Sequence, residues 1–225
     1  MTAATELRFQ ASRSSGEVSA LLELPDSARW LMVLGHGAGA GMRHHFMDDA
    51  AAALASHQIA TFRYQFPYME KRTSRPDPQP VLLATVRSAV AAAHAAAGDL
   101  PLLAGGKSMG GRMTSLASAE DGLPDVKGLV FFGFPLHPPG APGTGRAEHL
   151  ERVRTPMLFL QGTRDKLADL VLLGPVIERL GSKATLHIVE GGDHSFAVPK
   201  RSGRSLEDVL EELARTVAAW AERLT

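Results

Sequence analysis

Short apolar runs that alternate with helical segments constrain the fold of this chain most strongly. Runs such as WLMVLG, IATFRY and GLVFFGF are apolar at nearly every position. A strand covered on both faces has this pattern, whereas a half-exposed strand alternates apolar and polar residues. Segments with helical periodicity lie between the runs, among them residues 44–57, 80–98 and 205–224. The alternation predicts an α/β fold with a mostly parallel central sheet and helices on both faces.

The chain is long enough to bury one sizeable core. It has 225 residues, of which 44% are hydrophobic, so we expect a single domain over residues 1–225. Residues 5–12 and 17–24 alternate polar and apolar side chains and predict an antiparallel strand pair ahead of the parallel series. The Pro/Gly-rich segment 134–150 is the only plausible insertion, near the site, and is too short for a cap or second domain.

Charge and composition argue against several partners. The 24 basic and 24 acidic residues cancel, which disfavours nucleic acid or an anionic membrane as the main partner. Cysteine is absent, and no histidine pair has metal-ligand spacing with a carboxylate, so we expect no metal and no cofactor. No signal peptide is evident, and no apolar run approaches the ~20 residues needed to cross a bilayer. We therefore expect a cytoplasmic protein whose partner is a small-molecule substrate.

The stretch GGKSMGG, residues 105–111, admits two interpretations. A phosphate-binding Walker A loop requires G-x-x-x-x-G-K-[ST], but Pro101 stands where its first glycine should be, so this interpretation fails. Gly106 to Gly110 also spells G-x-S-x-G, in which a nucleophilic serine occupies a tight turn between a buried strand and a helix. The turn needs small residues two positions to either side of Ser108, and both are glycine.

An acid and a histidine follow in the order that a serine nucleophile requires. Asp165 comes just after the run PMLFLQG, and His194 just after ATLHIVEG. Since the carboxyl ends of parallel strands meet at one edge of a sheet, both are expected beside Ser108. His194 would act as general base, and Asp165 would hold its tautomer. Asp169 and Asp193 are the rival acids, but the first starts a helix and the second should point elsewhere.

Two backbone N–H groups are predicted to stabilise an oxyanion. One belongs to Met109, at the start of the helix after Ser108. The other belongs to the loop GHGAGAG (35–41), where Ala38 is the expected donor and Gly39 the alternative, with Gly39 also a candidate substrate contact. Residues 35–40 match a G-x-G-x-x-A dinucleotide pattern as well, which leaves a dinucleotide-binding protein as a minor alternative.

These blocks resemble the α/β-hydrolase superfamily over essentially the whole chain. HGAGAG, GGKSMGGRM, GTRD and GGDHSF are similar, in order, to its oxyanion, nucleophile, acid and histidine motifs. Residues 62–78 together with Lys107 look like the small lidless branch that includes dienelactone-hydrolase-like and testis-expressed-protein-like hydrolases. The resemblance implies an α/β-hydrolase fold without a large cap. It also implies a serine hydrolase that cleaves a small soluble carboxylic ester or thioester through an acyl-enzyme on Ser108.

Two other functions stay open beside this leading hypothesis. A peptidase could use the same fold, although such enzymes usually carry an additional domain for the peptide. A non-catalytic interaction protein could also retain a hydrolase fold, although an intact Ser108, Asp165 and His194 argue against decay.

Basic residues around the expected site raise the question of an anionic substrate. Arg63 follows a neighbouring strand, and Lys107 and Arg112 flank the serine, so they are candidates for binding a carboxylate-bearing or otherwise anionic group. The competing interpretation, which we favour, pairs Arg63 and Lys107 with nearby acids, for which the candidates are Glu70, Asp77 and Asp49.

Overall fold

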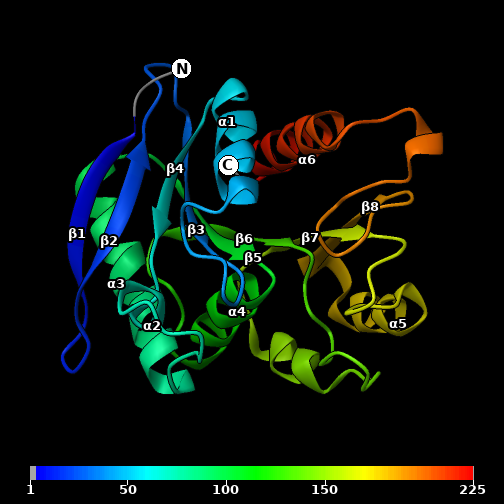
Figure 1. Ribbon diagram of the computed structural model, residues 1–225, viewed down its shortest axis with the longest axis horizontal. Coiled ribbons are helices and arrows are strands. Elements are labelled where there is room, and N and C mark those ends of the chain that lie inside the picture. The colour runs from blue at the N-terminus through cyan, green and yellow to red at the C-terminus, as the bar shows by residue number, and fades with distance from the viewer. Residues whose placement is uncertain (1–3, 225) are drawn as a thin grey trace.

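The computed structural model describes residues 4–224, whose eight strands form one sheet in the order β1-β2-β4-β3-β5-β6-β7-β8 (Figure 1). β1 (Thr5–Ser12) pairs antiparallel with β2 (Gly16–Glu23), and β2 pairs antiparallel with β4 (Ile59–Tyr64). The strands that run parallel to β4 are β3 (Trp30–Gly35), β5 (Leu102–Lys107), β6 (Val126–Phe132), β7 (Met157–Gly162) and β8 (Ala184–Val189). The predicted mostly parallel sheet and its antiparallel N-terminal pair are therefore confirmed.

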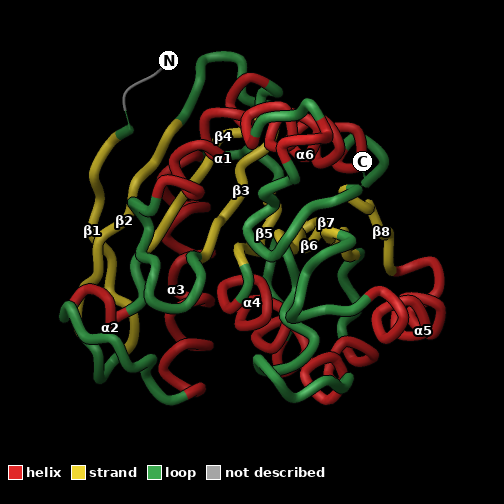
Figure 2. The backbone as a smooth tube through the Cα atoms, turned by 45° about the vertical axis from the view of Figure 1, so that its right-hand side comes forward, coloured by secondary structure: helices red, strands yellow, loops and turns green. Residues whose placement is uncertain are grey.

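Helices cover both faces of this sheet, as predicted (Figure 2). α1 (His45–Ser56) packs against α6 (Leu206–Ala221) on one face. The other face carries α3 (Gln79–Ala97), α4 (Met109–Asp121) and α5 (Leu170–Leu180). The short helix α2 (Pro67–Glu70) follows β4 and was not expected from the sequence. Three 3-10 helices complete the described elements, at Gly145–Arg152, Gly181–Lys183 and Lys200–Ser202.

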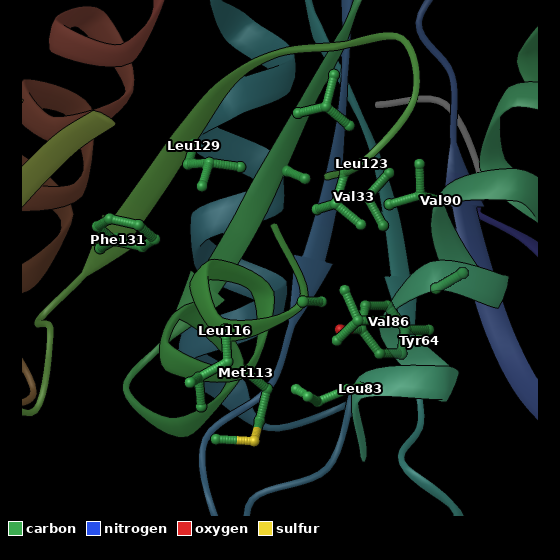
Figure 3. Packing of buried hydrophobic residues seen from close by; sticks show 14 of the residues in the cluster. Val33, Tyr64, Leu83, Val86, Val90, Met113, Leu116, Leu123, Leu129 and Phe131 are labelled. Carbon is green, nitrogen blue, oxygen red and sulfur yellow. The ribbon is translucent and has the colours of Figure 1, made fainter. Parts of the chain in front are cut away.

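Each parallel strand contributes side chains to two separate apolar cores, which explains its continuous apolar sequence. Val33 of β3 and Leu129 of β6 belong to the core beneath α3 and α4 (Figure 3). Their neighbours Leu34 and Val130 belong to the core beneath α1 and α6. Successive side chains of a strand point to opposite faces, so a covered strand must be apolar at both. Each such side chain contributes roughly 1.5–3 kcal/mol when fully buried.

The segment between β6 and β7 contains one 3-10 helix and no cap domain in the described part of the chain. The 3-10 helix Gly145–Arg152 packs on α4, where His149 Nε2 and Ser115 Oγ lie 2.7 Å apart in a hydrogen bond. Upstream of it, the N–H of His137 donates to the carbonyl of Leu167 at 3.2 Å. The segment between β6 and β7 is thus packed against α4 and the loop after β7.

Helix α3 corrects the expectation that no segment could cross a bilayer. Its 19 residues have a mean hydropathy of 1.3 in the most apolar window, which suffices by length and composition alone. In the structure 39% of that window is buried, and Leu82, Val86 and Val90 lie in the core. A core helix of this kind passes the same test, so the finding is weak evidence for a membrane span.

Glycines allow β3, β5 and α4 to approach each other closely. A Cβ placed on Gly110 would lie 2.2 Å from the carbonyl oxygen of Gly35, and one on Gly106 would lie equally close to that oxygen. A Cβ on Gly105 would lie 1.8 Å from the carbonyl oxygen of Val130 in β6. Backbone cannot yield to such contacts as a flexible side chain can, so these positions require glycine.

Substitution of Gly110 by alanine should therefore destabilise the fold. The added methyl group collides with the backbone of Gly35, so we expect Gly110→Ala to lower the free energy of unfolding by about 3 kcal/mol or more, measured by urea denaturation. Gly143→Ala is the matched control, since nothing lies within 4 Å of its Cβ position and its φ is not positive. That control should change stability by less than about 1 kcal/mol. Equal stability of the two variants would contradict the close-approach argument.

Candidate active site

Ser108 occupies a strained turn between β5 and α4. Its φ of 50° and ψ of −112° are unusual for a residue with a side chain. Its N–H donates to the carbonyl of Phe132 on the neighbouring strand at 3.1 Å, and the N–H of Arg112 donates to its carbonyl at 3.1 Å. Strand and helix together hold the turn, at the carboxyl edge of the sheet where the sequence placed it.

In the structure Ser108, His194 and Asp165 are joined by two successive hydrogen bonds, called the relay below. Nε2 of His194 lies 2.9 Å from Oγ of Ser108, and Nδ1 lies 2.8 Å from Oδ2 of Asp165. A carboxylate can only accept, so Nδ1 carries the proton and Nε2 is left to accept from the serine hydroxyl. The arrangement is suited to removing a proton from Oγ.

The carboxylate of Asp165 is completely buried and is held by two further donors. The side-chain amide of Gln161 donates to Oδ2, and the N–H of Leu167 donates to Oδ1 at 2.8 Å. Gln161 is itself buried, as the second-last residue of β7. The sequence analysis missed it, although a glutamine inside the otherwise apolar run PMLFLQG was a usable signal. Such bonds compensate a buried carboxylate for lost water.

The loop after β3 lies against the serine, as expected for an oxyanion site. A Cβ on Gly37 would lie 3.9 Å from Cβ of Ser108. Among the described residues, no acceptor is bound by the N–H groups of Ala38 and Met109; Ala38 lines the pocket around Ser108, and Met109 directly follows that serine. Gly39 is different, because its N–H donates to the hydroxyl of Tyr68 at 3.0 Å.

The bond to Tyr68 makes Gly39 a structural residue and corrects its assignment as a donor or substrate contact. Gly39 does not line the pocket around Ser108. No sequence pattern pointed to Tyr68, because the contact joins the loop after β3 to helix α2.

His36 holds the same loop in place through two hydrogen bonds of its neutral imidazole. Its Nδ1–H donates to the carbonyl of Gly37 at 2.7 Å, and its Nε2 accepts from the N–H of Phe66 at 3.2 Å. Burial lowers the pKa of His36 from 6.5 to about 4, although the bond to Gly37 opposes the shift. These contacts give His36 a structural role in the loop.

Arg63 does not reach the site, which corrects its assignment as a substrate-binding residue. Its guanidinium bonds to Asp48 on α1 and lies 3.5 Å from the carboxylate of Glu23, and its side chain is only 4% exposed. The prediction that Arg63 forms ion pairs is thus confirmed. Its partners are Asp48 and Glu23, whereas they were expected among Glu70, Asp77 and Asp49. Lys107 pairs with none of those acids, because its Nζ donates to the carbonyl of His194 at 2.6 Å.

Arg112 differs from these two residues because its guanidinium has no hydrogen-bond or ion-pair partner in residues 4–224, and its Nε is buried. Burial and the nearby Arg146 both lower the pKa of Arg112. Arg146 donates to the carbonyl of His137. Arg112 lies one turn of α4 after Ser108, with Arg146 of the 3-10 helix Gly145–Arg152 nearby, and within residues 4–224 no carboxylate bonds to either guanidinium.

A pocket of about 530 Å³ opens above the relay. Its wall includes Ala38, Ser108 and His194. Phe46 of α1 also lines it, together with His44 and His45 at the start of that helix, whose rings lie 4.0 Å apart and are tilted by 34°. Nδ1 of His44 accepts from the N–H of Phe46 and so caps α1. The size is that of a site for a small organic molecule.

The rival interpretations of nearby residues fit the structure less well. Asp169 caps α5 by accepting from the N–H of Val171 at 2.8 Å, and Asp193 accepts from N–H groups of its own turn. A dinucleotide loop needs a helix that starts within its glycine pattern, whereas α1 starts at His45, beyond residues 35–40. The dinucleotide alternative is therefore not supported.

Comparisons with known proteins agree with this architecture. A family model described as "Alpha/beta hydrolase domain" matches residues 28–222. Dienelactone hydrolase from Anabaena variabilis ATCC 29413 is 20% identical, with a TM-score of 0.75 over 98% of each chain. A lidless α/β serine hydrolase from Xanthomonas campestris is 20% identical, with a TM-score of 0.74 over 98% of this chain and 96% of that one. The esterase domain of a Rhodothermus marinus protein is 17% identical, with a TM-score of 0.72 over 98% of each chain. At these identities the solved structures show the fold that the chain shares.

The depressed pKa of His36 predicts that acid weakens the fold. The unfolded chain binds a proton near pH 6.5 and the folded chain only near pH 4, so stability is lost as the pH falls through this window. The loss attributable to His36 should approach about 3 kcal/mol at pH 4. In urea denaturation, His36→Asn should reduce the pH dependence, because asparagine retains a donor and does not titrate. His94→Asn, on the exposed face of α3, should leave the dependence intact, and identical slopes in all three proteins would contradict the assignment.

Proposed function

This chain belongs to the alpha/beta hydrolase family, and from that premise we propose that it is a serine hydrolase that cleaves small soluble carboxylic esters or thioesters through an acyl-enzyme. The observation that carries the proposal is the relay of 2.9 and 2.8 Å from Ser108 through His194 to Asp165. Nucleophile, base and orienting acid are the three groups that acyl transfer requires.

Acylation begins when Oγ of Ser108 attacks the carbonyl carbon of the substrate. The hydroxyl proton moves to Nε2 of His194, and Asp165 stabilises the imidazolium that forms. The electron pair of the carbonyl bond moves onto oxygen, which accepts from the N–H groups of Ala38 and Met109. When the tetrahedral intermediate collapses, the bond to the alcohol or thiol breaks, and Nε2 returns the proton to that leaving group.

Deacylation repeats the same steps with water. A water molecule gives a proton to Nε2 of His194 while its oxygen attacks the ester carbon of the acyl-enzyme. Collapse of the second tetrahedral intermediate releases the carboxylic acid and returns the proton to Oγ of Ser108. The enzyme is regenerated without an oxidant, reductant or cofactor.

The pocket supports small, water-soluble substrates. About 530 Å³ accommodates a molecule of modest size, and the segment between β6 and β7 does not fold over it as a cap. Long lipid chains would leave much apolar surface in water at such a site.

Covalent labelling tests the nucleophile. A fluorophosphonate probe should label the wild-type protein and fail to label Ser108→Ala, since Oγ is the attacking atom. Asp165→Asn should lower kcat for p-nitrophenyl acetate by about 10⁴-fold, because an amide donates where a carboxylate accepts.

Asp169→Asn is the matched control for the acid. Asparagine caps a helix as well as aspartate does, so this variant should keep wild-type kcat and melting temperature. A folded wild-type protein that takes no label would overturn the enzyme proposal. Ester hydrolysis that persists in Ser108→Ala would overturn the residue assignment.

We further propose that Arg112 and Arg146 favour substrates with an anionic substituent, because no carboxylate bonds to either guanidinium in residues 4–224. Neither residue lines the pocket around Ser108, so the preference applies to an anionic substituent that extends beyond that pocket. We expect kcat/KM for monoethyl glutarate to exceed that for the neutral isostere ethyl 5-methylhexanoate by about tenfold, the effect of one charge-assisted hydrogen bond.

The preference should disappear in Arg112→Gln, while hydrolysis of the neutral ester continues. Arg154→Gln removes an exposed arginine outside the pair and should retain the preference. Equal kcat/KM values of the wild-type protein for both esters would rule out the anionic preference and leave the hydrolase proposal standing.

A further inference from the structure

Lys107 directly precedes the serine, yet no step of the proposed reaction uses its side chain. It is the last residue of β5, and its Nζ donates a hydrogen bond of 2.6 Å to the carbonyl oxygen of His194. The residue before the proposed nucleophile is thereby bonded to the backbone of the proposed base, across 87 positions of sequence. The contact links the two loops whose separation decides whether Oγ and Nε2 can meet.

The turn that carries His194 is bonded mainly to itself. The N–H of Asp193 donates to the carbonyl of Ala197 at 3.0 Å, and the N–H of Phe196 donates to the carbonyl of Asp193 at 2.9 Å. The carboxylate of Asp193 also accepts from the N–H groups of Ser195 and Ala197. These bonds fix the shape of the turn but not its distance from Ser108. Asp165 and the N–H of Arg164 hold the turn from the loop after β7, and the bond from Lys107 ties it directly to β5.

Two aromatic rings lie beside the ammonium group of Lys107. Nζ lies 5.6 Å from the ring centroid of Phe46 on α1 and 5.7 Å from that of Phe196 in the histidine turn. The two rings are stacked, with centroids 6.0 Å apart and an interplanar angle of 17°. A cation at such distances from an aromatic face is attracted to it. Lys107 therefore joins α1, β5 and the histidine turn.

Gly133 leaves the room that this ammonium group occupies. The residue follows β6 and has a φ of 69°. A Cβ there would lie 3.2 Å from Nζ of Lys107, 3.4 Å from the carbonyl oxygen of His194 and 3.5 Å from Oδ2 of Asp165. The ammonium of Lys107, the carbonyl of His194 and the carboxylate of Asp165 therefore all lie close to Gly133.

The charge of Lys107 depends on pH in the working range of an enzyme. Burial lowers its pKa from 10.5 to about 8, while Asp165 and Asp193 oppose the shift. On the α1 side, burial lowers the pKa of His44, with smaller effects in the same direction from His45 and from the charge of Lys107, while Asp48 opposes the shift. At neutral pH the ammonium is charged, and above about pH 8 it becomes an amine with a weaker hydrogen bond and no cation–π attraction.

We propose that Lys107 is a positioning residue, which through its bond to the carbonyl of His194 holds Nε2 of that residue within hydrogen-bond distance of Oγ of Ser108. The inference rests on the proposed serine hydrolase function. Lys107 lines the pocket around Ser108 and could instead contact the substrate, but its Nζ is bonded to the carbonyl of His194 and lies beside the rings of Phe46 and Phe196.

Methionine at this position removes the donor and the charge while keeping the length of the side chain. Lys107→Met should lower kcat for p-nitrophenyl acetate by about 10²-fold, the usual effect of a displacement of about 1 Å between reacting groups. KM should stay nearly unchanged, because the side chain binds no substrate. Lys107→Arg keeps a charged donor and should recover part of the loss. Lys166→Met removes an exposed lysine next to Asp165 and should retain wild-type kcat. This control distinguishes loss of the hydrogen bond to His194 from loss of a positive charge near the site.

The pH profile distinguishes positioning from a purely structural role. In the wild-type protein, kcat/KM should fall as the pH rises through about 8, because Lys107 loses its proton. This alkaline limb should be absent from Lys107→Met, which does not titrate, and from Lys107→Arg, which stays protonated. If Lys107→Met does not fold, Lys107→Arg decides the matter, and an alkaline limb that persists in it would overturn the inference.

One measurement is independent of turnover. The proton shared by Nδ1 of His194 and Asp165 should give a far-downfield proton NMR resonance in Ser108→Ala, and the signal should vanish by exchange when Lys107→Met is added. If the wild-type protein neither takes the fluorophosphonate label nor cleaves any ester, the proposed function fails, and this resonance still tests Lys107. A signal unchanged in the double variant, or a kcat in Lys107→Met within threefold of wild type with the alkaline limb intact, would overturn the positioning role.

Discussion

One backbone contact, between the end of β3 and the start of α4, places the remaining parts of the site. The carbonyl oxygen of Gly35 occupies the space that side chains at residues 106 and 110 would fill. Three residues beyond Gly35 lies Ala38, and between Gly106 and Gly110 lies Ser108. The proposed nucleophile and the loop of the proposed oxyanion donor are therefore positioned by main-chain packing, which has no rotamers to change. Such rigidity suits donors that must face a developing charge without reorganising.

Beneath this contact lies a layer of buried polar groups, each with a defined partner. Asp165 accepts from Gln161 and Leu167, His36 bridges Gly37 and Phe66, and Lys107 reaches the carbonyl of His194. The bonds of Asp165 and the bond from His36 to Gly37 shape single loops, whereas His36 to Phe66 and Lys107 to His194 join segments that are distant in sequence. A buried polar group left without its partner is costly, so the layer also specifies how those loops must sit.

The sequence predicted the strands and long helices well, because a strand that feeds two cores is apolar at every position. It also predicted that Ser108, Asp165 and His194 would meet, because each follows the carboxyl end of a parallel strand and these ends lie at one edge of the sheet. It failed where partners come from tertiary contact: Arg63 pairs with Asp48, Tyr68 holds Gly39, and Arg146 approaches Arg112. Helix α2 is too short for a periodic pattern to reveal, and α3 showed that a core helix can be as apolar as a membrane span.

The segment that joins β6 to β7 has a kinetic consequence. Lipases with a mobile cover respond to a lipid surface because the surface opens the cover. Here the 3-10 helix Gly145–Arg152 is packed on α4, and Leu150 within it is fully buried, so the connection has no separate body that could swing aside. For a hydrolase built in this way, velocity should rise smoothly with dissolved ester. It should show no jump at the concentration where the ester begins to form droplets.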